Sequence, residues 1–345
     1  MVRAATLESQ STAEELAALR DPQEHTESSP EDNPYFRCSV RNFIDLLGSS
    51  QDTYARICQN LLELFPDTPM LSYDQVKRRV RKLSGVVTWE HHMCVHGCIG
   101  FTGPFSDLET CPECGESRYD QAKLEATDGL VKEPRKVFTT FPVGPQPQAH
   151  WKDPKSAEKM LYRWWKTQEL QQERKESGGI PRDYNDVLSG EAYLTAVDNG
   201  LVGEHNTVLM FSLDSAQLYR HKQSDCVIYI RIILDLAPDE RYKVRNILPG
   251  GVIPGPESLG NIESFLFPGL AHLSAIQKEG LPTWDGFHQA NFLSFILLLL
   301  VLADSVAMST LSGSVGHHGR RGCWLLCGLL GRNKVRGSHY YPALL

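Results

Sequence analysis

Four cysteines stand in two closely spaced pairs, and their side chains could together bind one metal ion. The first pair is Cys94-Val-His-Gly-Cys98 and the second is Cys111-Pro-Glu-Cys114-Gly. Such pairs are typical of sites in which two short turns present thiolates to a tetrahedral Zn²⁺. Four sulfur ligands leave no open coordination position. We therefore predict a structural zinc ribbon at residues 91–120, which needs its metal in order to fold.

Two other interpretations of these cysteines remain open. The thiols could form disulfides or stay as buried free thiols, although disulfides persist in oxidising compartments and Met1 to Thr12 contains no apolar signal segment. The chain is therefore not expected to be secreted. A histidine could also replace one of the sulfur ligands, and the candidates are His91, His92 and His96.

Asp214 and Asp304 each follow an apolar run with the pattern of a β-strand, at residues 207–213 and 292–303. Runs at 226–234 and 242–248 predict two strands between them, and residues 268–279 predict a helix. The order βββαβ is that of a ribonuclease H-like sheet, whose first and fourth strands lie side by side.

Carboxylates at the ends of two neighbouring strands would meet at one place and could bind Mg²⁺ or Mn²⁺. Metal ions held in this way can support an in-line attack on a phosphodiester. A plainer alternative remains open, because aspartate is also common at the turns that follow strands.

The whole chain has the pattern of a multi-domain protein of the α+β/α/β class. We predict a disordered acidic tail at 1–35, a helical region at 36–90, the ribbon at 91–120, a linker with an amphipathic helix at 121–200, and an incomplete ribonuclease H-like domain at 201–345. Within the helical region, Ser72 and Gln75 form a capping box. Residues 141–154 are predicted to be the linker and residues 155–176 the amphipathic helix, with Trp164 and Trp165 in the core.

The 345 residues include 42 acidic and 35 basic side chains, so net charge does not indicate a nucleic-acid-binding protein. Charge is unevenly placed, because no acidic residue follows Asp304. Residues 77–82 contain five basic side chains, which we interpret as a solvated helix face, with contact to DNA phosphates as the alternative. The apolar run at 292–303 is too short to cross a membrane, so no membrane partner is expected.

Several short motifs resemble those of the CACTA (En/Spm-like) DNA transposases, from about Val40 to the last residue. They are Cys98-Ile-Gly-Phe-Thr-Gly103, Cys111-Pro-Glu-Cys-Gly-Glu-Ser-Arg-Tyr119, Asp183-Tyr-Asn-Asp186, Leu209-Met-Phe-Ser-Leu-Asp214, Gln217-Leu-Tyr219, Ile253-Pro-Gly-Pro256 and Gly316-His-His-Gly-Arg-Arg-Gly-Cys323.

The resemblance implies a ribonuclease H-like domain with three catalytic carboxylates that cuts and joins transposon ends. Asp214 would be the first acid and Asp304 the second, with Mg²⁺ or Mn²⁺ as cofactor. Cys323, Cys327 and His339 would form a second zinc site. The resemblance also implies transposon-end DNA as partner and a nuclear location. It allows the chain to form an oligomer.

The sequence departs from this family at the third acid, which is expected after the second metal motif. No carboxylate side chain follows Asp304. We therefore expect a truncated and catalytically inactive copy. Two alternatives are a zinc-dependent module that binds DNA or protein without catalysis, and a fragment that folds poorly.

Overall fold

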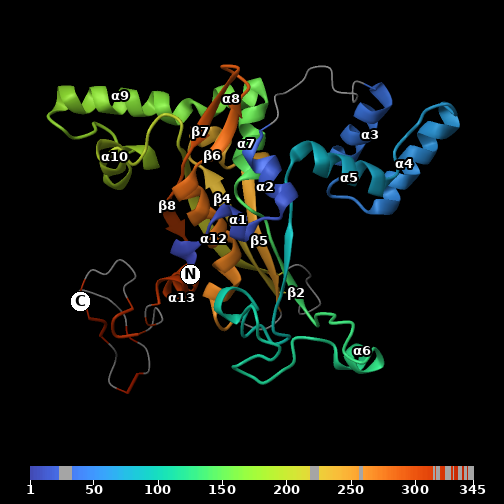
Figure 1. The fold of residues 1–345 in the computed structure, drawn as a ribbon. Coiled ribbons are helices and arrows are strands. Elements are labelled where there is room, and N and C mark those ends of the chain that lie inside the picture. Colours follow the sequence, from blue (N-terminus) through green and yellow to red (C-terminus); the bar gives the residue numbers. More distant parts are fainter. Residues whose placement is uncertain are drawn as a thin grey trace.

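A six-stranded mixed sheet forms the centre of the protein (Figure 1). A computed structural model describes residues 1–22, 33–217, 225–255 and 259–313, with residues 315, 319–322, 328, 330–332, 336, 337 and 340. The strands are β1 (Trp89–His92), β2 (Val137–Thr140), β3 (Thr207–Gln217), β4 (Asp225–Ile233), β5 (Ile247–Pro254) and β8 (Ile296–Leu302).

The order of strands across the sheet is β1-β2-β5-β4-β3-β8. Neighbouring strands are antiparallel except for β3 and β8, which are parallel. The predicted contact between the first and last strands of the C-terminal region is therefore confirmed. A separate hairpin of β6 (Leu281–Asp285) and β7 (Ala290–Ser294) precedes β8. The mixed α/β class predicted from the sequence is also confirmed.

Helices cover both faces of the sheet, and the alternation of side chains along β3 explains how. Leu209 packs into a core shared with α12 (Ile262–Glu279), whereas Val208 and Met210 pack on the other face against α10 (Glu191–Asp198). Because both faces are covered there, residues 208–211 of β3 form a continuous apolar run, whereas the far end of the strand is polar and exposed. None of the helices in the described ranges is both long and apolar enough to cross a membrane.

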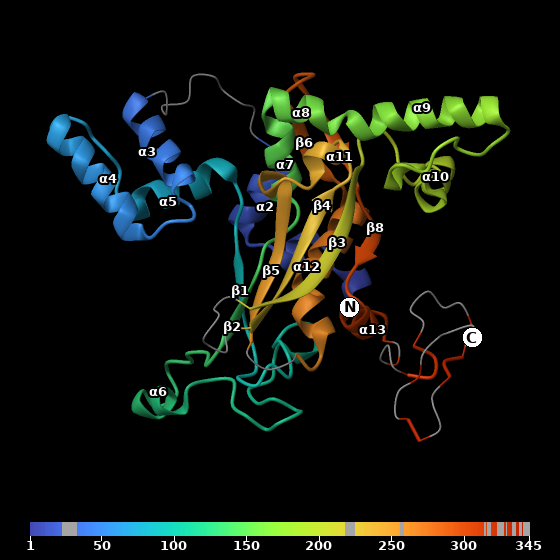
Figure 2. The same ribbon diagram turned by 180° about the vertical axis from the view of Figure 1, so that it is seen from behind.

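Three helices form a separate unit beside the sheet, opposite the long helix α9 (Figures 1 and 2). They are α3 (Pro34–Asp45), α4 (Gln51–Leu64) and α5 (Tyr73–Ser84). Their core contains Phe43, Tyr54, Cys58 and Val76. The predicted capping box of Ser72 and Gln75 is present at the start of α5. We call residues 33–85 the three-helix unit.

The predicted disordered tail at 1–35 is wrong for residues 1–22. This segment forms η1 (Val2–Ala4), α1 (Leu7–Gln10) and α2 (Ala13–Arg20). Leu7 and Leu19 are 2% and 4% exposed, in the same core as α12. This burial offsets the entropy lost on ordering, and composition alone does not reveal a contact so distant in sequence. Residues 23–32 lie outside the described ranges.

The predicted linker at 141–154 is also wrong, because it contains α7 (Pro145–Lys152) with Trp151 buried. The expected helix at 155–176 is divided into α8 (Pro154–Met160) and α9 (Tyr162–Ser177). Trp165 is 50% exposed, so the prediction that it lies in the core is wrong. Three further short helices are η2 (Gly103–Phe105), α6 (Gln121–Ala126) and η3 (Val187–Ser189).

Two predicted strands lie elsewhere in the sequence. Residues 238–246 hold α11 (Pro238–Arg241) and η4 (Val244–Asn246), so the strand predicted at 242–248 is wrong for most of its length. The third strand is β5, which begins at Ile247 and contains Pro249, Gly250 and Gly251. The run 292–303 is split between β7 and β8. Helix α12 begins at Ile262, before Pro268, so the order is βββα followed by a hairpin and a strand.

Strand β5 needs a glycine at position 250, because the Tyr229 ring on β4 lies against its backbone. This contact gives a test of how the two strands pack. A Cβ at this position would lie 2.2 Å from the Tyr229 ring. We expect Gly250→Ala to lower the free energy of unfolding by about 1–3 kcal/mol, because the buried ring cannot move aside freely. Gly48→Ala is the control, since nothing lies within 4 Å of its added Cβ. Urea denaturation measures both, and equal stabilities would contradict this packing.

Candidate functional site

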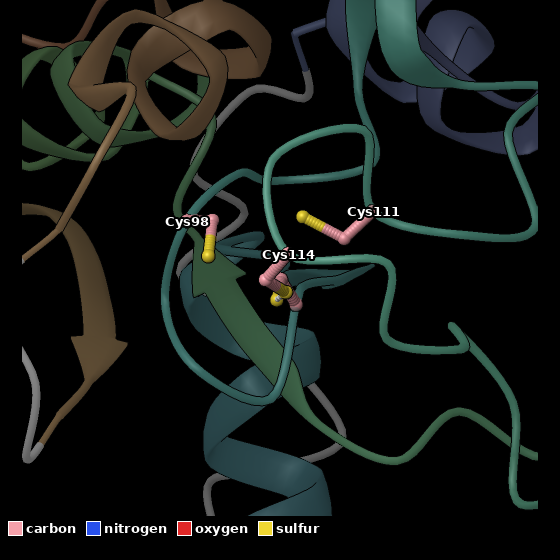
Figure 3. Close-up of side chains that lie close together, drawn as sticks. Cys98, Cys111 and Cys114 are labelled. Carbon is pink, nitrogen blue, oxygen red and sulfur yellow. Dashed lines mark hydrogen bonds between the residues drawn. The ribbon is translucent and has the colours of Figure 1, made fainter.

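The four predicted cysteines lie together. Their sulfur atoms are all within 4.8 Å of one another, and the Sγ atoms of Cys94 and Cys114 are 3.5 Å apart. In a tetrahedral site with Zn–S bonds of about 2.3 Å, the sulfurs are about 3.8 Å apart. Figure 3 shows Cys98, Cys111 and Cys114 close together on neighbouring loops. The cluster therefore fits one structural zinc ion.

Each pair of cysteines stands on a tight turn of the same design. In the first turn, the Cys94 amide donates to the Ile99 carbonyl at 2.9 Å, and the Gly97 amide donates to the Cys94 carbonyl at 3.0 Å. In the second, the Cys111 amide donates to the Glu116 carbonyl at 2.8 Å. Gly97 and Gly115 have φ angles of 72° and 75°. This left-handed conformation explains the glycine in each turn.

The thiols have different electrostatic surroundings. Burial raises the pKa of Cys98 and of Cys111. At Cys94 burial acts in the same direction, but the amides of His96 and Cys98 and the neighbouring thiols outweigh it, so that its pKa is lowered. The seven cysteines in the described residues are all free thiols. The disulfide alternative therefore finds no support there.

The three nearby histidines do not join the cluster. Burial lowers the pKa of His91 to about 4, and its ring packs against Phe138 with the centroids 5.1 Å apart. His92 accepts a hydrogen bond at Nδ1 from Arg118 Nε at 2.8 Å. His96 is exposed. Among the described residues, the metal-binding group consists of the four cysteines alone.

The ribbon is joined to the central domain, which the sequence did not predict. The Asn261 amide donates to the Cys98 carbonyl at 2.7 Å, and the Gly100 amide donates to Ser264 Oγ at 2.8 Å. A Cβ at Gly260 would lie 2.6 Å from the Cys98 carbonyl oxygen. Gly260 and Asn261 directly precede α12, and Ser264 lies in its first turn. The first cysteine turn is thus fixed to the helix that covers the sheet.

Asp214 and Asp304 lie just beyond the paired part of two adjacent parallel strands. Asp304 follows the end of β8 as predicted, but Asp214 lies within β3, which continues to Gln217 because it stays paired with β4. The last paired residues are Ser212 on β3 and Leu302 on β8, and each aspartate follows two residues later. Both aspartates are exposed. Asp304 caps α13 (Ser305–Ser312), because its Oδ1 accepts from the Ala307 amide at 2.7 Å. In the described ranges, the two carboxylates belong to no group of three or more metal ligands.

The other predicted metal ligands are Cys323, Cys327 and His339. All three lie outside the described residues. The second zinc site therefore stays a prediction.

Two buried ion pairs were not anticipated. Arg163 Nε and Asp235 Oδ1 are 2.7 Å apart, with side chains 0% and 1% exposed. Arg241 binds both carboxylate oxygens of Asp186, at 2.7 and 3.1 Å. Asp186 ends the motif Asp183-Tyr-Asn-Asp186, which gives that motif a structural role. In the sequence, only the acidic residue Asp186 in this motif hinted at an ion pair. Its partner Arg241 could not be identified, because it is 55 residues away.

Comparison of the sequence with models of known protein families found no match, and comparison with curated proteins also found none. The assignment of a function therefore depends on the geometry of this site and on the motif resemblance.

Proposed function

We propose that the chain derives from a CACTA (En/Spm-like) DNA transposase, whose ancestral reaction was metal-dependent cleavage and strand transfer of phosphodiesters. The observation that carries this proposal is the parallel pairing of β3 and β8, with Asp214 and Asp304 two residues beyond the same paired position. The order β5-β4-β3-β8, with one parallel pair at its end, supports a ribonuclease H-like sheet. DNA as the substrate implies a nuclear location.

Two carboxylates at this position suit Mg²⁺ or Mn²⁺, since both ions prefer oxygen ligands. A bound ion would stabilise negative charge on a phosphodiester oxygen. Asp214 and Asp304 each use one oxygen for a backbone amide, Ser215 and Ala307 respectively, which leaves the other oxygen for a metal ion. The family uses three acids, and no acidic side chain follows Asp304 among the 345 residues. We expect Asp214 and Asp304, without a third acid beside them, to bind a metal ion without cutting DNA.

The cysteine cluster has a different role in this proposal. Four thiolates would complete the coordination of zinc, so the metal would have no position for substrate. Zinc would instead hold the two turns together and keep the ribbon against α12. The same cluster supports the second candidate, a non-catalytic zinc-dependent module that binds DNA or protein. One observation favours the non-catalytic module: Asp304 caps α13, so it has a structural role that requires no metal ion.

Binding of Mn²⁺ distinguishes the two candidates. We expect Asp214→Asn and Asp304→Asn each to weaken Mn²⁺ binding at least tenfold, measured by electron paramagnetic resonance of the zinc-loaded chain. A metal site loses affinity when a charged ligand becomes neutral. Asparagine keeps the cap of α13, because it is as good a cap as aspartate. Asp239→Asn, at an exposed acid on α11, is the control.

The same samples are tested for cleavage of a DNA duplex with Mg²⁺ or Mn²⁺. We expect no cleavage by the wild-type chain above the level of Asp214→Asn. Equal Mn²⁺ binding by all four proteins would refute a metal role for Asp214 and Asp304 and leave the non-catalytic module. Cleavage that disappears in Asp214→Asn would mean that a third carboxylate is available, and that the chain is active.

A further inference from the structure

The outer surface of α5 carries five basic side chains, which we call the basic face. Its members are Lys77, Arg78, Arg79, Arg81 and Lys82, and all are exposed. Arg78 donates to the Asp74 carbonyl at 3.3 Å, and Arg79 lies over the Phe36 ring at 5.2 Å. Neither contact neutralises a charge. Within the described residues, no carboxylate forms an ion pair with this face, so its charge is available to a ligand.

Helical spacing separates the basic face from the core of the unit. Arg78, Arg81 and Lys82 stand at positions i, i+3 and i+4, which are neighbours on one side of a helix. The opposite side holds Val76, which is 0% exposed, and Val80, which packs against the core. Arg78 and Arg81 are exposed and lie outside this core, so they are not needed to fold the three-helix unit.

The unit holds α5 in a fixed position. The Tyr73 ring packs against Phe43 and Tyr54, with centroid distances of 5.3 and 5.7 Å. The Tyr54 hydroxyl donates to the Leu71 carbonyl at 2.9 Å, just before the capping box at Ser72. A ligand that binds the basic face therefore meets a preorganised helix, which lowers the entropic cost of binding.

The charge of the unit is opposite to that of the chain. Residues 33–85 contain eight lysines and arginines and five acids, whereas the whole chain has 35 basic and 42 acidic side chains. A polyanion would therefore be attracted to this unit more strongly than to the rest of the chain, whose net charge is negative. The helix of twelve residues is about 18 Å long, and the major groove of DNA, about 12 Å wide, admits an α-helix.

We propose that the basic face of α5 binds the phosphate backbone of double-stranded DNA. This inference deepens the proposed function, on which it rests for the choice of DNA as ligand, and it does not depend on the carboxylates. It favours the alternative that the sequence left open for residues 77–82, contact with DNA phosphates, over a solvated helix face. The three-helix unit becomes the part of the protein that holds DNA.

The test is fluorescence anisotropy with the full zinc-loaded chain and a fluorescein-labelled duplex of about two helical turns. Arg78→Ala with Arg81→Ala removes two charges from the basic face. The control, Lys155→Ala with Lys175→Ala, removes two exposed charges from α8 and α9. Each phosphate contact contributes about 0.9 to the slope of log K against log salt. We expect the first variant to lose about 1.8 of this slope and about tenfold or more in affinity, with the control unchanged.

Three results would overturn the proposal. These are equal affinity of the basic-face variant and wild type, equal losses in both double variants, and binding of phosphatidylserine vesicles by this face with no binding of the duplex. Circular dichroism and zinc content show whether each variant is folded. The Mn²⁺ measurement is separate, because Arg78→Ala with Arg81→Ala leaves Asp214 and Asp304 intact. A failure of DNA binding can thus be distinguished from a failure of the metal site.

Discussion

Replacing Cys94 by serine should remove one zinc ion per chain and lower the free energy of unfolding by several kcal/mol. Structural zinc contributes about 10–16 kcal/mol of apparent binding free energy in small zinc domains, and losing one ligand forfeits a large share of it. Cys94 is 1% exposed and lies in the turn that is fixed to α12 through Asn261 and Ser264. We therefore expect the loss to reach the central domain.

The measurements are zinc content by mass spectrometry and thermal unfolding with and without a chelator. Cys38→Ser is the matched control, because Cys38 lies on α3, outside the cluster. It should keep the zinc content of the wild type and unfold near the wild-type temperature. Zinc binding requires deprotonated thiols, so its affinity should fall as pH is lowered. Full zinc retention in Cys94→Ser would refute a four-cysteine site.

Asp235→Ala should cost about 3–5 kcal/mol of stability, because it leaves the buried guanidinium of Arg163 without its counter-charge. Asp235 Oδ2 also accepts a hydrogen bond from the Val208 amide at 2.8 Å, and that buried donor would lose its partner as well. Arg163 lies at the start of α9, and Val208 lies on β3. The ion pair thus fixes this helix to the centre of the sheet.

Urea denaturation of Asp235→Ala and Asp198→Ala isolates the contribution of burial. Asp198 pairs with Arg174 at 2.9 Å, but its side chain is 46% exposed. An exposed pair of this kind is worth about 0–1 kcal/mol. A loss in Asp235→Ala no larger than that in Asp198→Ala would show that the buried pair does not hold α9 to the sheet.

The features that sequence predicted well are those determined by neighbouring residues. The cysteine turns depend on a few adjacent positions, and the start of α5 depends on Ser72 and Gln75. The adjacency of β3 and β8 was also predictable, because the order of elements restricts how strands can pair. The cysteine cluster and the pairing of β3 with β8 were therefore within reach of the sequence.

The features that sequence missed depend on contacts between distant residues. Leu7 donates its amide to Glu279 Oε1 at 2.9 Å, across 272 positions, and composition alone predicted disorder for that segment. Asp235 and Arg163 are 72 positions apart, so neither reveals the other in the sequence. Gly250 lies just beyond the strand predicted at 242–248, so the sequence assigned it no place in the sheet. Its true role, close approach to the Tyr229 ring, is visible only when β4 and β5 are paired.

The two edge strands of the sheet, β1 and β8, differ in how readily each could pair with a further strand. Strand β1 is four residues long and carries Glu90, and short charged strands resist further pairing. At the other border, β8 is seven aliphatic residues with no charge, and Val301 and Leu302 are 41% and 48% exposed. The edge at β1 is therefore protected against pairing, whereas the edge at β8 is open to it. Any added strand, whether from further polypeptide or from another copy, would extend the sheet at β8.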